Sequence, residues 1–234
     1  MLDYIIIETN NIDIKTLHTL YDIYSIYAED CTRDDYLIEI INGCFTHIIL
    51  YQDNNDIIGY TNIKYDKTFI NQNILLLIIS DSVLLEKYIG NSNISYSITL
   101  FYNTIINNNF KEKIYMFWSS NTIYTFLYIS NLITYYPNIN NTIHPENLNY
   151  IINYCGLGLS NKYNNFCIPY SCGDGKIKHK YIDFRNFLNK IDLKYVDLFL
   201  KYNPNYINGD CICLFAELTL QDINNIQYKY NSKL

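Results

Sequence analysis

The sequence lacks basic runs, and its charge balance is negative. Lys and Arg number 17 against 23 Asp and Glu, which gives a formal net charge of −6 at neutral pH. Proteins that bind duplex nucleic acid neutralise its phosphates with clustered Lys and Arg. We therefore expect no nucleic acid as a main partner.

Long apolar runs and targeting signals are also missing. No apolar stretch reaches the roughly 18 residues that span a bilayer. The start, Met1-Leu2-Asp3-Tyr4, has neither the positive segment nor the small-residue cleavage site of a signal peptide. We expect a soluble, cytoplasmic chain without a membrane partner, in the host cytoplasm if its origin is viral.

Paired cysteine motifs are absent as well. The seven cysteines are an odd number, and none forms a Cys-x-x-Cys pair. Cys167, Cys172 and His179 are the candidate zinc ligands, but their spacing is irregular and no fourth ligand is evident. The sequence favours reduced, partly buried thiols and no metal.

Tyrosine is abundant, whereas glycine is scarce. The chain holds 26 Tyr and only 8 Gly, and Asn and Ile are also frequent. An AT-rich genome explains this bias better than a functional tyrosine array does, so a Tyr can stand here where another protein has Leu. At 49% hydrophobic and 17% charged residues, the 234-residue chain is long and apolar enough to fold around a core.

Hydrophobic periodicity predicts the elements of the first half of the chain. In chain order, these are a strand over 4–8, a helix from Asp13, a second helix ending near Asn42-Gly43, a hairpin of strands over 46–51 and 57–65, an apolar strand over 74–79 that ends in Ser80-Asp81-Ser82, a glycine turn over 87–93, a helix around Phe101, a strand over 114–118 and a helix from Ser119–Asn121 to just before Pro137.

The pattern is different after Pro137. We expect a polar linker, a short helix from Pro145 to about Tyr154 and an irregular excursion over 156–180. A helix capped by Asp192 buries Val196, Phe199 and Leu200. A strand over 211–217 follows Asn203-Pro204 and Gly209-Asp210, and Thr219 with Asp222 predicts a capping box.

This order resembles that of the GNAT superfamily of acetyl-CoA-dependent N-acetyltransferases. The most specific match is Asn121-x-x-Tyr124-x-x-x-Tyr128, which is similar to the family's Asn-x-x-Ala-x-x-x-Tyr on the fourth helix. The strings 124–127 and 135–137, with Asn203-Pro204 and Gly209-Asp210, resemble a little-characterised bacterial and fungal GNAT-like group that carries a C-terminal extension. At the pyrophosphate turn, Lys87-x-x-Gly90-x-Ser92 departs from the family's Arg/Gln-x-x-Gly-x-Gly/Ala.

The resemblance implies an α/β (α+β) fold with a mixed, mostly antiparallel central sheet flanked by helices. An acyltransferase core would span 1–142. An extension over 143–234 would pack on it, adding helices and a strand that completes the sheet.

The resemblance also implies a site for acetyl-CoA or coenzyme A. Tyr128 would be the general acid, since a phenol donates a proton to a thiolate while it stays neutral at pH 7. Asp81 is the best candidate for the base, and Asp30 and Asp34 would attract a cationic amine. The residues expected to bind the cofactor are Ile79, Ser80, Ser82, Val83, Gly90, Asn91, Ser92, Asn93, Ser95 and Asn121.

Each of these roles has a structural alternative. Tyr128 is otherwise an ordinary core or surface Tyr, and Asn121 a helix cap. Asp81 is otherwise a solvated loop carboxylate, and the acidic residues around Arg33 are helix-end charges, with Thr32 or Asp34 as the N-cap. His47, on a strand, is expected to be a packed histidine.

The leading hypothesis is an acyl-CoA-dependent N-acyltransferase that transfers acetyl to a primary amine, either a small molecule or a peptide, as a monomer or homodimer. One alternative is a degenerate GNAT-like domain that binds CoA or a partner without catalysis. Another is an oligomerising scaffold with tyrosine-rich surfaces.

Overall fold

The computed structural model describes residues 3–42, 45–69, 74–88, 101, 103–104, 113–130, 133, 135–137, 167–168, 176–178, 193–219, 221–222 and 224. The chain forms two compact units. The first comprises Met1–Ile26, Thr32–Met116 and Leu218–Leu234, and the second comprises Tyr27–Cys31 and Phe117–Glu217.

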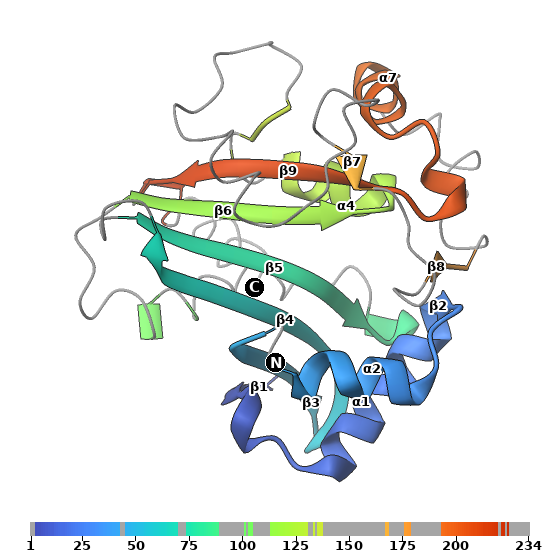
Figure 1. Cartoon of the computed structure of the whole chain (residues 1–234), viewed down its shortest axis with the longest axis vertical. Coiled ribbons are helices and arrows are strands. Elements are labelled where there is room, and N and C mark those ends of the chain that lie inside the picture. The colour runs from blue at the N-terminus through green and yellow to red at the C-terminus, as the bar shows by residue number, and fades with distance from the viewer. Residues whose placement is uncertain are drawn as a thin grey trace. The chain divides into compact units, whose positions relative to one another are not determined.

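An antiparallel sheet forms the centre of the first unit (Figure 1). Its strands lie in the order β1-β3-β4-β5, and each pairs antiparallel with its neighbour. Their bounds are β1 Asp3–Glu8, β3 His47–Asp53, β4 Asp56–Phe69 and β5 Ile74–Leu84. Strand β3 is buried on both faces over its first five residues, so the core lies against the middle of this sheet.

Two capped helices connect β1 to β3. Helix α1 (Ile14–Tyr27) begins after Asp13, whose carboxylate accepts hydrogen bonds from the amide and hydroxyl of Thr16 at 2.8 and 2.9 Å. Helix α2 (Arg33–Ile41) begins with a capping box, in which Thr32 and Asp35 each accept a bond from the other. The expected N-cap role of Thr32 is confirmed.

The hairpin between β3 and β4 turns on Asn54 and Asn55. Both lie in the left-handed region, with φ of 52° and 69°, and Asp53 pairs with Asp56 across them. Two successive positive-φ residues in a two-residue loop are the geometry of a type I′ turn, which Asn tolerates better than most residues. The predicted hairpin is confirmed, with longer strands than periodicity predicted.

Strand β5 corrects one expectation about the polar triplet 80–82. The sequence predicts that the strand ends there, but β5 continues to Leu84. It continues because Ser82, Val83 and Leu84 pair with Thr61, Tyr60 and Gly59 of β4. Ser80, Asp81 and Ser82 are therefore strand residues rather than loop residues.

The boundary between the units falls within β6 (Lys113–Ser120). In the second unit, the strand order is β6-β9-β7, and a separate two-stranded sheet pairs β2 with β8 (Figure 1). The other bounds are β2 Ala28–Glu29, β7 Cys167–Ile168, β8 Lys176–Ile177, β9 Cys211–Leu218, α4 Ile123–Ser130 and α7 Leu193–Tyr202. Three 3-10 turns complete the described elements: η1 Thr9–Asn11 and η2 Glu86–Tyr88 in the first unit, and η6 Tyr206–Asn208 in the second.

Aromatic contacts hold the core of the second unit together. Phe126 of α4 lies 5.6 Å from Phe199 of α7 and 5.7 Å from Tyr135, measured between ring centroids. Phe117 of β6 lies 5.0 Å from Phe215 of β9 in the same way. In α7 the buried residues include Leu198, whereas Leu200, expected inside, is only half-buried.

The predicted mixed, mostly antiparallel α/β fold is confirmed, and so is the capping box of Thr219 and Asp222. The predicted helix over 145–154 lies outside the described residues, and the division at residue 142 stays a prediction. None of the described helices is both long and apolar enough to cross a membrane.

Candidate functional site

A β-bulge interrupts β5 inside the segment expected to bind a thioester. Thr61 pairs with Ser82, but Ile63 pairs with Ile79. One residue of β4, Asn62, therefore faces two residues of β5, Ser80 and Asp81. A bulge leaves the extra residue out of the hydrogen-bond ladder and bends the strand, and bulges are frequent beside active sites.

Three hydroxyl groups cross the sheet next to this bulge. The Tyr51 phenol lies 2.6 Å from Oγ1 of Thr61, which lies 3.0 Å from Oγ of Ser82. Tyr51 and Thr61 are fully buried, whereas Ser82 is half-buried. The three residues come from β3, β4 and β5, so the path runs from the core to the bulged strand.

Gly59 allows β4 to approach β5 closely on the side of the bulge where Thr61 pairs with Ser82. A Cβ atom at this position would lie 2.3 Å from the carbonyl oxygen of Val83 and 2.9 Å from Cα of Leu84. Both are backbone atoms, so a side chain would require the strands to separate. The glycine is therefore a packing requirement.

The segment that leads from β5 toward Gly90 is anchored by η2. The Tyr88 hydroxyl donates a hydrogen bond to Oδ2 of Asp53 at 2.5 Å. The Lys87 ammonium lies 4.6 Å from the centre of the Tyr88 ring, and a hydrogen bond with the Tyr88 side chain raises the pKa of Lys87. Lys87, of the expected phosphate turn, therefore stays positively charged at neutral pH.

The other residues expected to bind the cofactor have different placements. Ile79 is buried and Val83 half-buried on β5, while the side chains of Ser80 and Asp81 are outside what the structure describes. The turn residues Gly90, Asn91, Ser92, Asn93 and Ser95 lie outside the described part of the chain.

Helix α4 belongs to the second unit and carries Tyr128, which is half-buried. Its N-cap is Thr122, whose hydroxyl oxygen accepts a hydrogen bond from the amide of Thr125 at 3.2 Å. The alternative role of Asn121 as the cap is therefore wrong, because Thr122 occupies that position. Asn121 lies half-buried just before the helix.

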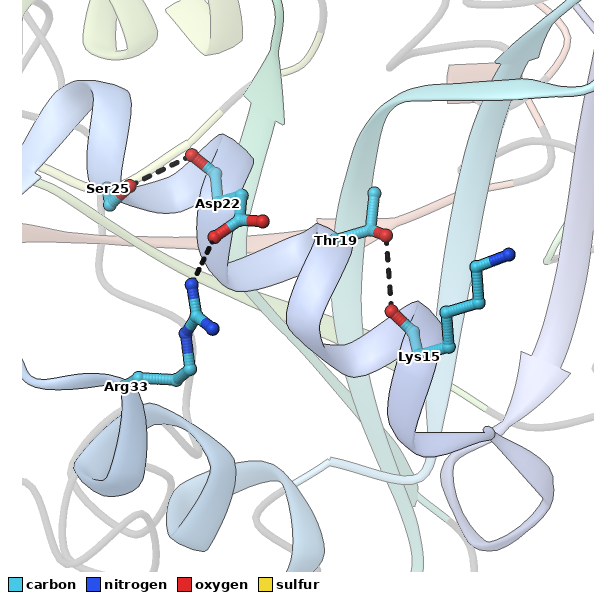
Figure 2. Close-up of polar contacts among 5 residues, drawn as sticks. All are labelled: Lys15, Thr19, Asp22, Ser25 and Arg33. Atoms are coloured by element: carbon cyan, nitrogen blue, oxygen red, sulfur yellow. Dashed lines mark hydrogen bonds and ion pairs between the residues drawn. The ribbon is translucent and has the colours of Figure 1, made fainter.

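Of the acidic residues near Arg33, Asp22 and Asp35 form bonds within or between the two helices. Figure 2 shows the Arg33 guanidinium bonded to the Asp22 carboxylate of α1, at 2.6 Å, while the Asp22 carbonyl accepts a bond from Ser25. Asp35 closes the capping box. Asp34 is exposed on the first turn of α2, and Asp30, in the second unit, is exposed with a φ of 66°.

A second polar cluster is buried in the second unit. The side-chain amide of Asn203 donates to the Asp210 carbonyl at 2.9 Å, and the Cys167 thiol lies 3.9 Å from the Asp210 carboxylate. Burial raises the pKa of Cys167 to about 12, so the thiol is protonated and unreactive at neutral pH. Of the zinc candidates, Cys172 and His179 lie outside the described residues, among which no metal-binding group of His, Cys, Asp or Glu occurs.

His47 is a packed histidine, as the sequence predicts. The residue is 6% exposed, the centre of its ring lies 5.2 Å from that of Phe101, and its Nδ1 lies 3.1 Å from Oγ1 of Thr46. Burial lowers the pKa of His47, although the charge of Glu8 acts in the opposite direction.

Sequence reasoning missed Tyr51, Gly59 and Thr61, which shape the surroundings of the bulge. Gly59 did carry a signal, because an isolated glycine inside a strand pattern indicates a bulge or a close backbone approach. The two hydroxyl residues carried none, since a Tyr and a Thr on neighbouring strands are ordinary sheet residues.

No family model and no curated protein matches the sequence. Solved structures that resemble the chain include an aminoglycoside acetyltransferase from an uncultured soil metagenomic sample, with a TM-score of 0.42 and 14% identity over 56% of this chain and 86% of that one. Glucosamine-6-phosphate N-acetyltransferase from Arabidopsis thaliana has a TM-score of 0.41 and 10% identity over 62% and 97% of the two chains. A predicted acetyltransferase with acetyl-CoA from Clostridium acetobutylicum has a TM-score of 0.41 and 13% identity over 64% and 98%.

All three TM-scores are below 0.5, so the fold assignment rests on the chain's own strand order and registers. A strand, two helices, a hairpin and a long bulged strand are followed, later in the chain, by a strand and a helix. Over these elements, the observed order agrees with the order on which the resemblance described in the sequence analysis is based.

Proposed function

We propose that the chain is an acyl-CoA-dependent N-acyltransferase that transfers acetyl from acetyl-CoA to a primary amine by direct attack. The observation that carries the proposal is the bulge at Ser80 and Asp81 on β5. It lies where the family resemblance expects exposed strand backbone to hold a thioester. Backbone N–H groups outside the ladder are suitable donors to a carbonyl oxygen.

Acyl-CoA supplies an activated thioester carbon to this reaction. The amine nitrogen attacks that carbon, the C–N bond forms, and the C–S bond then breaks. Asp81 accepts the proton that the cationic amine must lose before its nitrogen can attack, and Tyr128 donates a proton to the departing thiolate. The second proton that the nitrogen loses after the attack restores the Tyr128 phenol. Ile79, Ser80, Ser82, Val83, Asn121 and the turn over 90–95 are the residues that we propose for binding the cofactor.

The acceptor is a cationic amine in its resting form. Asp34 is exposed on the first turn of α2, and Asp30 is exposed directly after β2. We assign them the role of raising the local concentration of such an amine through their charge.

A thermal-shift titration with acetyl-CoA tests whether the cofactor binds. At a ligand concentration 100 times its Kd, binding stabilises the folded chain by about 2.7 kcal/mol. Removal of the cofactor should reverse the increase in melting temperature. A chain that gains nothing from acetyl-CoA or CoA is not a cofactor-binding protein, and the scaffold alternative then stands.

Release of free thiol, measured over a panel of amino sugars, polyamines, peptide N-termini and aminoglycosides, tests turnover. We expect one of these amines to be acetylated, with Tyr128→Phe lowering kcat by about 100-fold, within the range for a lost general acid. Tyr124→Phe is the matched control, because Tyr124 lies on the same helix and is exposed. Binding without turnover on any amine would identify a binding domain instead, and equal rates for the two variants would remove Tyr128 from the mechanism.

A further inference from the structure

The hydroxyls of Tyr51, Thr61 and Ser82 form a continuous hydrogen-bonded path across three strands. The oxygen-to-oxygen distances are 2.6 and 3.0 Å, and both residues on the inner side are fully buried. Buried hydroxyls cost free energy unless they are bonded. Phe and Val would fill the space of Tyr51 and Thr61 without that cost, so packing alone does not account for this path.

The chemistry of the three groups gives the path a direction. Each hydroxyl has one hydrogen, so Thr61 can donate to only one of its two neighbours. A phenol is more acidic than an alcohol and is therefore the stronger donor, which agrees with the short 2.6 Å bond between Tyr51 and Thr61. In this direction, Tyr51 donates to Thr61 and Thr61 donates to Ser82, whose oxygen accepts the bond.

The outer end of the path lies beside the bulge. Ser82 follows Ser80 and Asp81 directly, and it is the half-buried member of the three. Gly59 and Tyr60 pair with Leu84 and Val83, which holds β4 against β5 up to this point. The Ser82 hydroxyl is thus polarised by its bond with the buried Thr61 hydroxyl, and its strand is held in place by pairing with β4.

We propose that Ser82 donates a hydrogen bond to the carbonyl oxygen of an acyl thioester, and that Thr61 and Tyr51 are positioning residues that orient and polarise it. This inference rests on the proposed acyltransferase function and deepens it, because it assigns a side-chain donor to the reacting group. As the amine attacks, the carbonyl oxygen gains negative charge and the bond from Ser82 strengthens. The charge returns to the carbonyl when the C–S bond breaks, and Ser82 keeps its proton throughout.

The first test needs no turnover. It compares the Kd of acetyl-CoA with that of S-ethyl-CoA, a thioether that has no carbonyl oxygen, by calorimetry on the full chain. We expect acetyl-CoA to bind about threefold to tenfold more tightly, the range that one neutral hydrogen bond gives. Ser82→Ala should abolish this preference, and Thr61→Val and Tyr51→Phe should reduce it, with Thr61→Ser retaining it.

Two matched controls separate this effect from general destabilisation. Tyr60→Phe removes a phenol from the neighbouring position of β4, which is equally buried. Thr9→Val removes a threonine hydroxyl that donates to the Phe45 carbonyl at 2.6 Å, outside the path. Both variants should keep the wild-type preference for acetyl-CoA.

The second test is kinetic, with the amine acceptor found in the panel. Ser82→Ala should lower kcat by about tenfold or more, with little change in the KM of acetyl-CoA, because a donor to a developing oxyanion acts mainly in the transition state. Thr61→Val should also lower kcat, but it should have no further effect when Ser82 is already Ala. A double-mutant cycle with this result identifies Thr61 as a residue that acts through Ser82.

The outcomes separate this inference from the proposed function. A carbonyl preference that depends on Ser82, in a chain without turnover, supports the donor and overturns the acyltransferase. Turnover with an unchanged preference and an unchanged kcat in Ser82→Ala overturns the donor and leaves the acyltransferase. Failure to bind either CoA derivative overturns both.

Discussion

Replacement of Gly59 by Ala should move β4 away from β5 beside the bulge. The new Cβ would lie 2.3 Å from the Val83 carbonyl oxygen, about 1 Å closer than the ordinary contact limit of 3.4 Å. A neighbouring bond joins the Leu85 amide to the Ile58 carbonyl at 2.8 Å. A shift of that size along this bond would break it, since hydrogen bonds weaken steeply beyond about 3.2 Å.

The free energy of unfolding should fall as a result. Overpacking against backbone costs about 1–3 kcal/mol, and one lost hydrogen bond costs about 1 kcal/mol. Restricting the unfolded chain returns about 0.4–1 kcal/mol. The net loss is then roughly 1–3.6 kcal/mol, which lowers Tm by roughly 2–14 °C for a chain of this size.

Circular-dichroism melts of the wild type and Gly59→Ala measure this loss. Lys64→Ala is the control, because it places the same methyl group at a half-exposed position of β4. An unchanged or higher Tm for Gly59→Ala would contradict the close approach of the two strands. Acetyl-CoA affinity should also fall in Gly59→Ala and stay unchanged in Lys64→Ala, because only the first variant displaces the strand residues that adjoin Ser82.

Three further predictions concern other described residues. Burial lowers the pKa of His47, so its stabilising contribution is complete above the unfolded-state pKa of about 6.5 and is lost as the pH falls below it. Urea denaturation at pH 7.5 and 5.5 should show that the free energy of unfolding falls less for His47→Gln than for the wild type as the pH is lowered. An equal fall in the two proteins would contradict the lowered pKa of His47. Cys167 is fully buried and has a pKa of about 12, so it should react with iodoacetamide at pH 8 only as fast as the chain unfolds. Half-exposed Cys211 should react before Cys167. Peptide mass spectrometry measures the order of modification. Thr32→Ala removes the cap of α2 and should cost about 1 kcal/mol in chemical denaturation, whereas no change in stability would show that the capping box is dispensable.

Local chemistry determined much of the fold and could therefore be predicted. Asp13 and Thr32 cap helices through side chains one turn away, and Asn54-Asn55 closes a hairpin through its own backbone preference. These interactions involve residues within a few positions of one another. For that reason, residue types along the chain predicted a helix from Asp13, a hairpin connected through Asn54-Asn55, and Thr32 as one of two candidate caps.

The polar triplet of β5 shows that residue types alone do not predict where a strand ends. Ser80, Asp81 and Ser82 resemble a strand end by residue type, yet the strand continues because Thr61 of the partner strand bonds to Ser82. Likewise β2, β7 and β8 have two residues each. Elements this short contain no periodicity, so they arise from their pairing partners alone.

The candidate site depends on a property that belongs to two strands together. A bulge exists only relative to a register, and here Thr61 with Ser82 fixes the register on one side while Ile63 with Ile79 fixes it on the other. The extra residue must then lie at 80–81, because neither flanking pair can slip without moving side chains to the opposite face of the sheet. Gly59 and Thr61 lie on β4, yet they determine the position of the β5 backbone that we propose binds the acyl group. Substitutions at these two positions should therefore alter the site by moving that backbone, and not by removing a contact with the ligand.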